Sequence, residues 1–404
     1  MVLEGKHILV GISGGIAAYK IPELIRTLKK QGAEVRVTAT KSALQFVTEL
    51  TLQTVSGARV YSDVFAAINE HSTEHISLPE WADMMLVAPA TANVIGKMAD
   101  GIADDALTTT FCSCSARKPI VIAPAMNDKM WECPATQKAI EELKSWANVT
   151  VVEPAVGELA CGTNGKGRMP EVEVLVEQVK AALTEKTMAG KRVLITAGPT
   201  VEKIDPVRYI SNFSTGKMGY ALARACLRRG AEVTLVSGPT QQKIEGYDGL
   251  RMVDVESAQQ MYEAVKEAFA KVDMAILCAA VADYTPKEVA DRKIKRQSES
   301  ENLCLELKAN PDIAAWLGKQ KKAGQVLVGF ALETDHEEAN AQKKLQSKGL
   351  DWIVLNSLQD KGAGFGTDTN KVSLYSADGT KKDCPLGMKE AVSEWIVNQL
   401  TIDN

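Results

Sequence analysis

The stretch HILVGISGGIAAYKIPELIRTLKKQGAEVRVTAT (7–40) decides the fold. An apolar run at 7–13 predicts a strand that ends at Gly14 and Gly15. A helical pattern follows it and stops at Gly32, and a second strand pattern occupies 34–40. A strand, a helix and a strand in this order form a βαβ unit, so we expect a parallel sheet with a right-handed crossover.

The same alternation continues along the first half of the chain. Residues 81–93 form an apolar run that ends in small residues, and residues 118–127 form another. Both runs are typical of buried strands in a parallel sheet, which are apolar on both faces. Strands that alternate with helices predict a doubly wound α/β sheet.

The pattern then restarts, which indicates a second domain. A strand at 191–200 ends in a Gly-Pro turn, and residues 271–284 repeat the frame of the earlier Asp-Met strand. We therefore predict two Rossmann-like domains with doubly wound parallel sheets, at 1–189 and 190–404, with the seam in the helical stretch 172–190.

Composition narrows the class of protein. The chain has 404 residues and a net charge of −4, so no basic field indicates binding to nucleic acid or an anionic membrane. No apolar run reaches the length of a membrane span, and no basic leader precedes the first strand. The eight cysteines lack metal-ligand spacing and fit a reducing compartment, so we expect a cytoplasmic protein.

The residues that follow the first two strands indicate which kind of nucleotide could bind at the ends of these strands. An NAD site needs GxGxxG and a carboxylate after the second strand, to hold the ribose diol. Here the glycine turn is GISGG (11–15), and the second strand ends in Thr38, Thr40 and Ser42. Hydroxyl groups suit a phosphate or a ligand such as FMN, although the same residues are also ordinary in turns. An NAD(P)-dependent reductase remains the alternative enzyme.

Several motifs of the first half occur together in a fixed order. They are GISGGIAAYK (11–20), His75, PATANVIGKMADGIADD (89–105) and PAMNDKMW (124–131). This set resembles the flavoprotein family of cysteine decarboxylases, which implies a flavodoxin-like FMN domain. The glycine-rich stretch ELACGTNGKGRMPE (158–171) is similar to the flap that covers the substrate in the coenzyme A branch of that family.

The second half carries a different set of motifs. They are RYISNFSTGKMG (208–219), AAVADY (279–284), KIKR (293–296) and NPDI (310–313). This set resembles the CTP-dependent phosphopantothenate–cysteine ligases. Over the whole chain, the order of motifs is that of the bifunctional decarboxylase–ligases of coenzyme A biosynthesis.

The resemblance implies a role for residues of the first half. Bound FMN would oxidise the carbon next to sulfur, so that the cysteine carboxylate can leave as CO2. His75 would handle protons, Asn127 would bind substrate, Cys161 would return a proton, and Arg168 and Met169 would contact substrate. Each of these residues could also have an ordinary structural role in a turn, loop or core. The implied FMN contacts are Gly11, Ser13, Gly14, Ser42, Thr91, Ala92 and Asn93, with Thr91 in place of the family's serine.

In the second half, the resemblance implies that CTP activates the carboxylate of 4′-phosphopantothenate as an acyl-cytidylate. Asn212 and Lys293 would take part in that reaction, with Asn212 also holding the substrate. Mg2+ would accompany the triphosphate, but the sequence identifies no metal ligands. A lysine pair on a helix face can equally be a solvated surface. The implied CTP contacts are Ala279, Asp283, Lys293, Pro311, Asp312, Ile313, Phe330, Lys344 and Lys348.

Three further points concern partners and alternatives. The resemblance implies a homo-oligomer in which decarboxylase trimers are joined by ligase dimers into a dodecamer, with no nucleic acid or membrane partner. The alternative that is not an enzyme is a flavin-binding regulatory subunit, against which the presence of His75, Asn127 and Cys161 argues. The Gly/Asp-rich stretch 357–372 has no assigned role.

Overall fold

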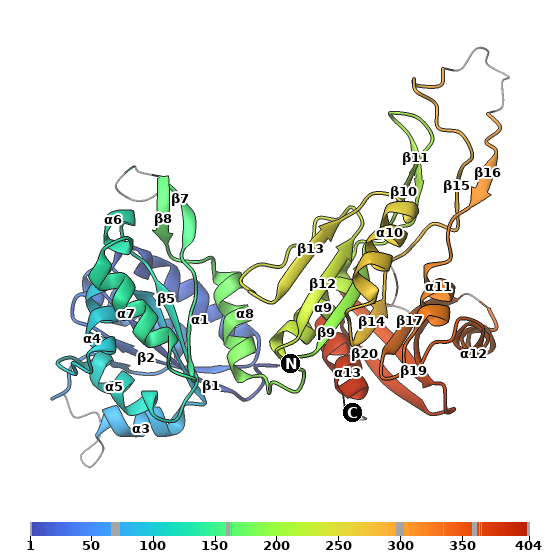
Figure 1. The fold of residues 1–404 in the computed structure, drawn as a ribbon. Helices are drawn as coiled ribbons and strands as arrows, with labels where there is room; N and C mark the ends of the chain where they lie inside the picture. The colour runs from blue at the N-terminus through green and yellow to red at the C-terminus, as the bar shows by residue number, and fades with distance from the viewer. Residues whose placement is uncertain are drawn as a thin grey trace. The chain divides into compact units, whose positions relative to one another are not determined.

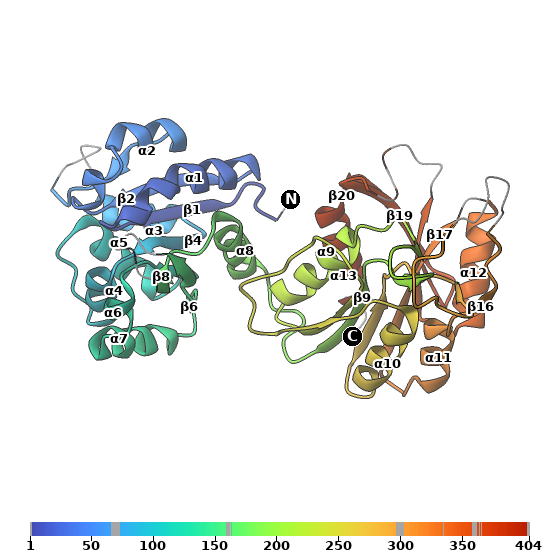
Figure 2. The same ribbon diagram turned by 90° about the horizontal axis from the view of Figure 1, so that it is seen from above.

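The computed structural model describes residues 2–65, 73–158, 162, 164–295, 303–333, 335–357, 362, 364 and 366–401. Its chain divides into two compact units, Met1–Thr184 (unit 1) and Glu185–Asn404 (unit 2). Figures 1 and 2 label most of the helices and strands of both units.

A six-stranded parallel sheet forms the centre of unit 1, in the order β3-β2-β1-β4-β5-β6. This is the order of the doubly wound dinucleotide fold, and without the two-residue edge strand β3 it becomes the flavodoxin-like order. The predicted Rossmann-like fold is therefore confirmed. The strands are β1 (His7–Ile12), β2 (Glu34–Ala39), β3 (Val60–Tyr61), β4 (Met84–Ala90), β5 (Ile120–Pro124) and β6 (Val149–Val151).

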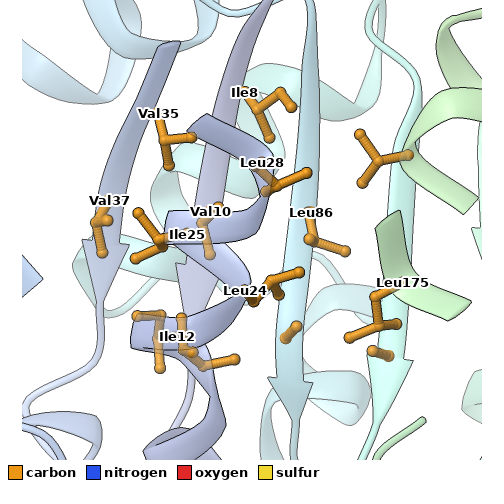
Figure 3. Close-up of a cluster of buried hydrophobic side chains, with 14 of the residues drawn as sticks. Ile8, Val10, Ile12, Leu24, Ile25, Leu28, Val35, Val37, Leu86 and Leu175 are labelled. Atoms are coloured by element: carbon orange, nitrogen blue, oxygen red, sulfur yellow. The ribbon is translucent and has the colours of Figure 1, made fainter. Parts of the chain in front are cut away.

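Apolar layers cover both faces of this sheet. Helices α1, α2 and α8 lie over one face, and Figure 3 shows Leu24, Ile25 and Leu28 of α1 packed against Val10 and Val37 of the strands. Helices α3, α4, α5 and α7 cover the other face. The helices are α1 (Ile21–Lys30), α2 (Glu49–Ser56), α3 (Glu74–Trp81), α4 (Ala92–Ala99), α5 (Ala106–Ser115), α6 (Asp128–Trp131), α7 (Pro134–Lys144) and α8 (Val172–Leu183).

A small antiparallel hairpin, β7 (Ala155–Glu158) and β8 (Asn164–Arg168), lies beside the end of β5. The Met126 amide donates to the Gly167 carbonyl over 2.9 Å. A Cβ on Gly167 would lie only 2.3 Å from the Met126 carbonyl oxygen, so this close approach requires glycine. The hairpin is thus fixed to the segment that carries Asn127.

Unit 2 repeats the sheet order of unit 1 and extends it. Six parallel strands run β13-β12-β9-β14-β17-β18, and the antiparallel strands β19 and β20 continue the sheet beyond β18. The sequence predicted the parallel part but not this hairpin. The strands are β9 (Arg192–Ala197), β12 (Glu232–Ser237), β13 (Leu250–Asp254), β14 (Met274–Leu277), β17 (Val326–Glu333), β18 (Trp352–Ser357), β19 (Thr369–Ser376) and β20 (Lys381–Met388).

Five helices cover the two faces of the second sheet. Helices α9 and α13 lie on one face, and α10, α11 and α12 lie on the other. Two short antiparallel pairs, β10 (Val201–Lys203) with β11 (Tyr209–Ser211) and β15 (Tyr284–Pro286) with β16 (Leu307–Ala309), project from the sheet (Figure 1). The helices are α9 (Lys217–Arg228), α10 (Ala258–Phe269), α11 (Ile313–Gln320), α12 (Glu337–Ser347) and α13 (Lys389–Thr401).

In the part of the chain that the structure describes, no helix is long and apolar enough to cross a membrane. The same residues contain no group of three or more His, Cys, Asp and Glu side chains that could hold a metal ion.

Candidate active sites

A cavity of about 1130 Å³ lies in unit 1 at the carboxyl ends of the parallel strands; we call it cavity 1. Gly14 follows β1, Ser42 follows β2, Thr91 follows β4 and Asn127 follows β5. Ligands of doubly wound sheets bind at this edge, because the loops there leave a crevice between the strand ends. Four separate segments of the sequence therefore meet at one site.

Ser13 holds two of these loops together. Its side chain is fully buried, and its Oγ donates to the Pro89 carbonyl over 2.7 Å. The same Oγ accepts from the Thr91 amide over 3.0 Å. Gly14 packs so closely that a Cβ would lie 2.4 Å from the Cβ of Ser42. The loops after β1, β2 and β4 thus form a rigid floor.

Most of the residues predicted to bind FMN or substrate line cavity 1, and a minority do not. Gly11, Ser13, Ala92 and His75 are not among the described residues that line it. A Cβ on Gly11 would lie 2.4 Å from a methyl group of Leu107, so this glycine permits packing of α5 on the sheet. The predicted residues that do line the cavity are Gly14, Ser42, Thr91, Asn93, Asn127, Arg168 and Met169.

The structure describes only one of the two residues that were predicted to handle protons. His75 lies half-buried in the first turn of α3. Cys161 lies outside the described residues. Their predicted roles therefore stay predictions.

Part of the cavity wall is apolar and exposed. Ile16 and Tyr19 are 58% and 63% exposed, Phe65 is 95% exposed and Met130 is 48% exposed. Exposed apolar groups beside a rigid polar floor suit a ligand with one flat apolar part and one polar part.

Charged side chains also line cavity 1, and the sequence did not single out Lys20 or Lys97. Glu171 accepts from Lys20 over 2.9 Å and from Arg168 over 2.7 Å, and the hydrogen bond from Lys20 is the main cause that lowers the pKa of Glu171. Lys97 contacts Asp104 over 2.6 Å, which raises the pKa of the lysine. Lys97 stands four residues after Asn93, so its helical spacing could have revealed it.

A second cavity, of about 710 Å³, lies in unit 2; we call it cavity 2. Its wall includes residues 277–284 after β14 and residues 309–314 before and within α11. The strand β17 contributes Phe330, and the start of α9 contributes residues 214–219. This cavity therefore also lies at the carboxyl end of a parallel strand.

Hydrogen bonds fix the wall that follows β14. The Asn212 side chain donates to the Ala280 carbonyl over 3.0 Å, and the Asn310 side chain donates to the Ala282 carbonyl over 2.8 Å. The Ala282 amide donates to Thr200 Oγ1 over 3.0 Å. The small residues here let a ligand approach the backbone closely.

Lysines surround cavity 2. Lys344 pairs with Glu333 over 2.6 Å, and Lys348 pairs with Asp312 over 3.2 Å. Asp312 also caps α11 by accepting from the Ala315 amide over 2.9 Å. These pairs hold two ammonium groups beside the cavity while balancing their charge.

Two more lysines line cavity 2 at the starts of α9 and α13. Lys217 pairs with Asp368 over 2.6 Å, and this hydrogen bond lowers the pKa of Asp368. Lys389 is 8% exposed and donates to the carbonyls of Gly364 and Thr367. Burial, followed by repulsion from Lys217, lowers the pKa of Lys389.

Lys293 is the one predicted CTP contact that is not among the described residues lining cavity 2. Its neighbour Ile294 is held by Arg208, which donates to the Ile294 carbonyl over 2.9 Å, and by Asp205, which accepts from the Ile294 amide over 3.1 Å. The predicted residues that line the cavity are Asn212, Ala279, Asp283, Pro311, Asp312, Ile313, Phe330, Lys344 and Lys348.

Comparison with known proteins identifies both units. A family model described as "Flavoprotein" matches residues 2–184, and one described as "DNA/pantothenate metabolism flavoprotein C-terminal domain" matches residues 188–402. A Bacillus subtilis protein named "Coenzyme A biosynthesis bifunctional protein CoaBC" is 47% identical over 403 residues, which cover 99% of this chain and 97% of the relative.

The chain belongs to the family of bifunctional coenzyme A biosynthesis proteins. A family member from Escherichia coli K12 is 41% identical over 99% of this chain and 98% of its own length. Another relative, named "Cysteine/Cysteine sulfinic acid decarboxylase", is 49% identical over 88% of this chain and 98% of its own length.

Solved structures match each half separately. The crystal structure of the C-terminal domain of a bifunctional CoaBC protein is 42% identical, covers 54% of this chain and 98% of its own, and gives a TM-score of 0.45. The FMN-binding protein AtHal3 is 34% identical, covers 44% of this chain and 96% of its own, and gives a TM-score of 0.39. The nearly full-length relatives and the two family models show that the chain is a bifunctional enzyme of coenzyme A biosynthesis.

Proposed function

We propose that unit 2 joins cysteine to 4′-phosphopantothenate with CTP, and that unit 1 then decarboxylates the product to 4′-phosphopantetheine with FMN. The observation that carries this proposal is the nearly full-length likeness to bifunctional coenzyme A biosynthesis proteins. Each unit also has its own cavity at the carboxyl ends of its strands, as two separate reactions require.

The residues of cavity 1 fit FMN. A rigid floor of Gly14, Ser42 and Thr91 would hold the polar parts of the cofactor, while Ile16 and Tyr19 offer apolar surface for its ring system. When bound, FMN supplies the two-electron oxidation that turns the carbon next to sulfur into an electron sink.

The protein's own groups then bind the substrate and move protons. We propose that Asn127 and Arg168, which line cavity 1, bind the substrate's polar groups. His75 would accept a proton, and Cys161 would donate one to the product after CO2 has left. A Cys161→Ser variant should therefore release CO2 yet accumulate the oxidised ene-thiol product.

In cavity 2 the chemistry is acyl activation. A carboxylate oxygen of phosphopantothenate would attack the α-phosphorus of CTP, and pyrophosphate would leave. The amine of cysteine would then attack the acyl carbon and release CMP. Lysines at the cavity, with Mg2+, would offset the charge of the triphosphate, and Asn212 would orient the reacting carbonyl.

The test is an assay of the purified chain with CTP, cysteine and phosphopantothenate. We expect pyrophosphate and CO2 to appear in sequence, and we expect a yellow protein with a flavin absorbance spectrum. Protein that stays colourless and inactive after FMN is added would refute the proposal for unit 1. Lack of pyrophosphate release would refute the proposal for unit 2.

A second candidate for unit 1 comes from the relative named cysteine/cysteine sulfinic acid decarboxylase. Free cysteine and cysteine sulfinic acid should be assayed beside phosphopantothenoylcysteine. We expect the highest kcat/KM with the phosphorylated substrate, because Arg168 and Lys20 line the cavity. A preference for free cysteine would favour the second candidate.

We also infer from the family that the protein is a cytoplasmic homo-oligomer, with trimers of unit 1 joined by dimers of unit 2. Several apolar side chains of both units are exposed, among them Phe65 and Phe213 at 95% and 90%. Such side chains are typical of surfaces that a second copy covers. Light scattering of the purified protein gives the mass that tests this arrangement.

A further inference from the structure

Lys217 has a carboxylate partner that belongs to a segment without an assigned role. The lysine is the first residue of α9 and lines cavity 2. Its ammonium group lies 2.6 Å from Asp368, which precedes β19 in the Gly/Asp-rich stretch 357–372. The positive charge of Lys217, which could bind an anionic ligand, is therefore already neutralised by a carboxylate of the protein itself.

Asp368 is held in this position by its own backbone and by Lys389. The Lys389 amide donates to the Asp368 carbonyl over 2.8 Å. The buried Lys389 ammonium donates to the carbonyls of Gly364 over 3.0 Å and Thr367 over 2.7 Å. A buried ammonium group is retained only where polar partners satisfy it, so these bonds fix the described part of the segment against α13.

The ion pair between Lys217 and Asp368 is weak enough for a phosphate group to replace the carboxylate. The Lys217 side chain is 31% exposed and the Asp368 side chain is 69% exposed. Solvent screens such a pair, whereas a phosphate group brings more charge and more acceptor oxygens than a carboxylate. The amide at the N-terminal end of α9 also favours an anion at this place.

We propose that Asp368 pairs with Lys217 as an internal competitor before substrate binds, and that a phosphate group of the substrate displaces it. The proposal rests on the proposed ligase function of unit 2. The phosphate could belong to CTP or to 4′-phosphopantothenate, which share this chemistry. Asp368 then lowers the affinity of unit 2 for that substrate.

The test is the binding of each phosphate-bearing compound to the full-length Asp368→Asn variant. Titration calorimetry with CTP, inorganic pyrophosphate and phosphopantothenate separates the possible sources of the phosphate. Because an exposed ion pair contributes little, we expect the dissociation constant to fall only about two- to fivefold for the compound that contacts Lys217. If Asp368 merely supported the fold, the Asp368→Asn variant would bind each compound with unchanged or lower affinity.

A double-mutant cycle isolates the exchange from a general effect of charge. Lys217→Met should weaken binding, and adding Asp368→Asn to it should then change nothing. Asp383→Asn removes the same charge from β20 at a residue that does not line cavity 2, and it should leave all three dissociation constants unaltered. Equal tightening by Asp383→Asn, or tightening by Asp368→Asn without Lys217, would overturn the proposal.

The outcomes also separate this proposal from the ligase function. If the wild-type protein binds none of the three compounds, the ligase assignment fails. If it binds them and Asp368→Asn gives no tighter binding, only the competitor role fails. Asp368→Ser is a second variant that removes the carboxylate, and circular dichroism of each variant verifies that it is folded.

Discussion

Asn212 shows how a single side chain connects a loop to the wall of cavity 2. Its amide group donates to the Ala280 carbonyl, beside the predicted nucleotide contact Ala279. The asparagine amide can donate to this carbonyl, whereas a carboxylate in the same position accepts but does not donate.

Asn212→Asp should therefore impair ligation and spare decarboxylation. The variant loses one hydrogen bond and places two acceptors face to face, so we expect ligation to slow by about tenfold or more. Pyrophosphate release and CO2 release, each measured with its own substrate, check this outcome. A similar loss of both activities would show that the two reactions are wrongly assigned to the units.

The cysteine thiols should differ in reactivity because their pKa values differ. Burial raises the pKa of Cys278 and of Cys226 to about 12, whereas backbone amides of Thr136 and Ala135 lower the pKa of the exposed Cys133. Because the thiolate is the nucleophile, a raised pKa leaves less of the reactive form at any given pH.

We expect iodoacetamide at pH 8 to label Cys133 at least tenfold faster than Cys278 or Cys226. Peptide mass spectrometry over a time course measures the three rates, and unfolded protein serves as the control in which they converge. The rate at Cys133 should stop rising with pH earlier than the rate at an unperturbed thiol. Fast labelling of Cys226 in the folded protein would contradict its burial.

Residues at strand ends were the most predictable part of the sites. Gly14, Ser42 and Asn127 all line cavity 1, as expected because apolar runs end just before them and parallel strands share one edge, and their roles stay predictions. Lys389 was not found, because it lies outside the quoted motifs, 76 residues after the end of NPDI (310–313), and only the tertiary fold brings it to cavity 2. Lys293 was expected beside the nucleotide on resemblance alone, and its role stays a prediction.

At the scale of elements, the turn after β12 packs directly on the turn after β9. A Cβ on Gly238 would lie 1.7 Å from the Pro199 carbonyl oxygen, so the two backbones touch. Pro199 in turn pairs with Ala280 in an isolated parallel bridge. The wall of cavity 2 therefore depends on a glycine that lies outside that wall.

Gly238→Ala should destabilise unit 2 by about 1–3 kcal/mol, because the added methyl group must push backbone apart. Urea titration followed by circular dichroism measures the loss. Gly96→Ala is the matched control, since nothing lies within 4 Å of a Cβ there and alanine favours the helix α4. Unchanged stability of the Gly238 variant would mean that the two turns can separate without cost.

Helices α9 and α13 are joined by buried charges. Arg228 is fully buried and contacts Glu390 over 2.6 Å and Glu394 over 2.7 Å, and Arg229 contacts Glu394 over 2.5 Å. Removing Arg228 takes away one of the two arginines that contact the mostly buried Glu394, while Glu390, at 41% exposed, can still be hydrated.

Arg228→Met should therefore lower the free energy of unfolding of unit 2 by about 1–3 kcal/mol, the range for lost hydrogen bonds to charged groups. Chemical denaturation measures the change, and Arg251→Met on the surface is the control, since Arg251 and its partner Glu267 are 70% and 79% exposed. The flavin spectrum should stay the same, because Arg228 belongs to unit 2. A loss below about 1 kcal/mol would show that the charges do not stabilise the packing.

Element boundaries were less predictable than element types. The sequence predicted one helix over 16–32, but the structure has a 3-10 helix at Ile16–Lys20 before α1. Pro22 explains the break, because proline lacks an amide donor and fits only the first turn of an α-helix. The β19–β20 hairpin was missed because its long-range pairing has no local signature in the sequence.

At the scale of the whole molecule, each cavity lies within one unit. The units repeat one strand order, and the motif sets of the sequence divide between them in the same way. The sequence predicted this duplication because strand and helix patterns recur in the same order. Ligand binding in one unit should therefore leave the other unit's local stability unaltered.

Hydrogen exchange measured by mass spectrometry checks this independence. Addition of CTP should slow exchange in peptides that contain residues 214–219 and 278–284, and not in peptides of unit 1. Removal of FMN should speed exchange around residues 13–15, 40–42 and 89–93, and not in peptides of unit 2. Protection of unit 1 by CTP would contradict independent sites.

The β19–β20 hairpin has a consequence for protein quality control. It places β20 at the end of the eight-stranded sheet, and Lys381, Lys382 and Pro385 on that strand discourage further strands from joining. A ribosome that stalls before this hairpin is complete releases a polypeptide in which Val372 and Leu374 of β19 pair with β18 but lack β20 on their other side, so that β19 is an open edge. Such unfinished chains would be prone to amyloid-like assembly, and they are the species that chaperones and proteases must remove.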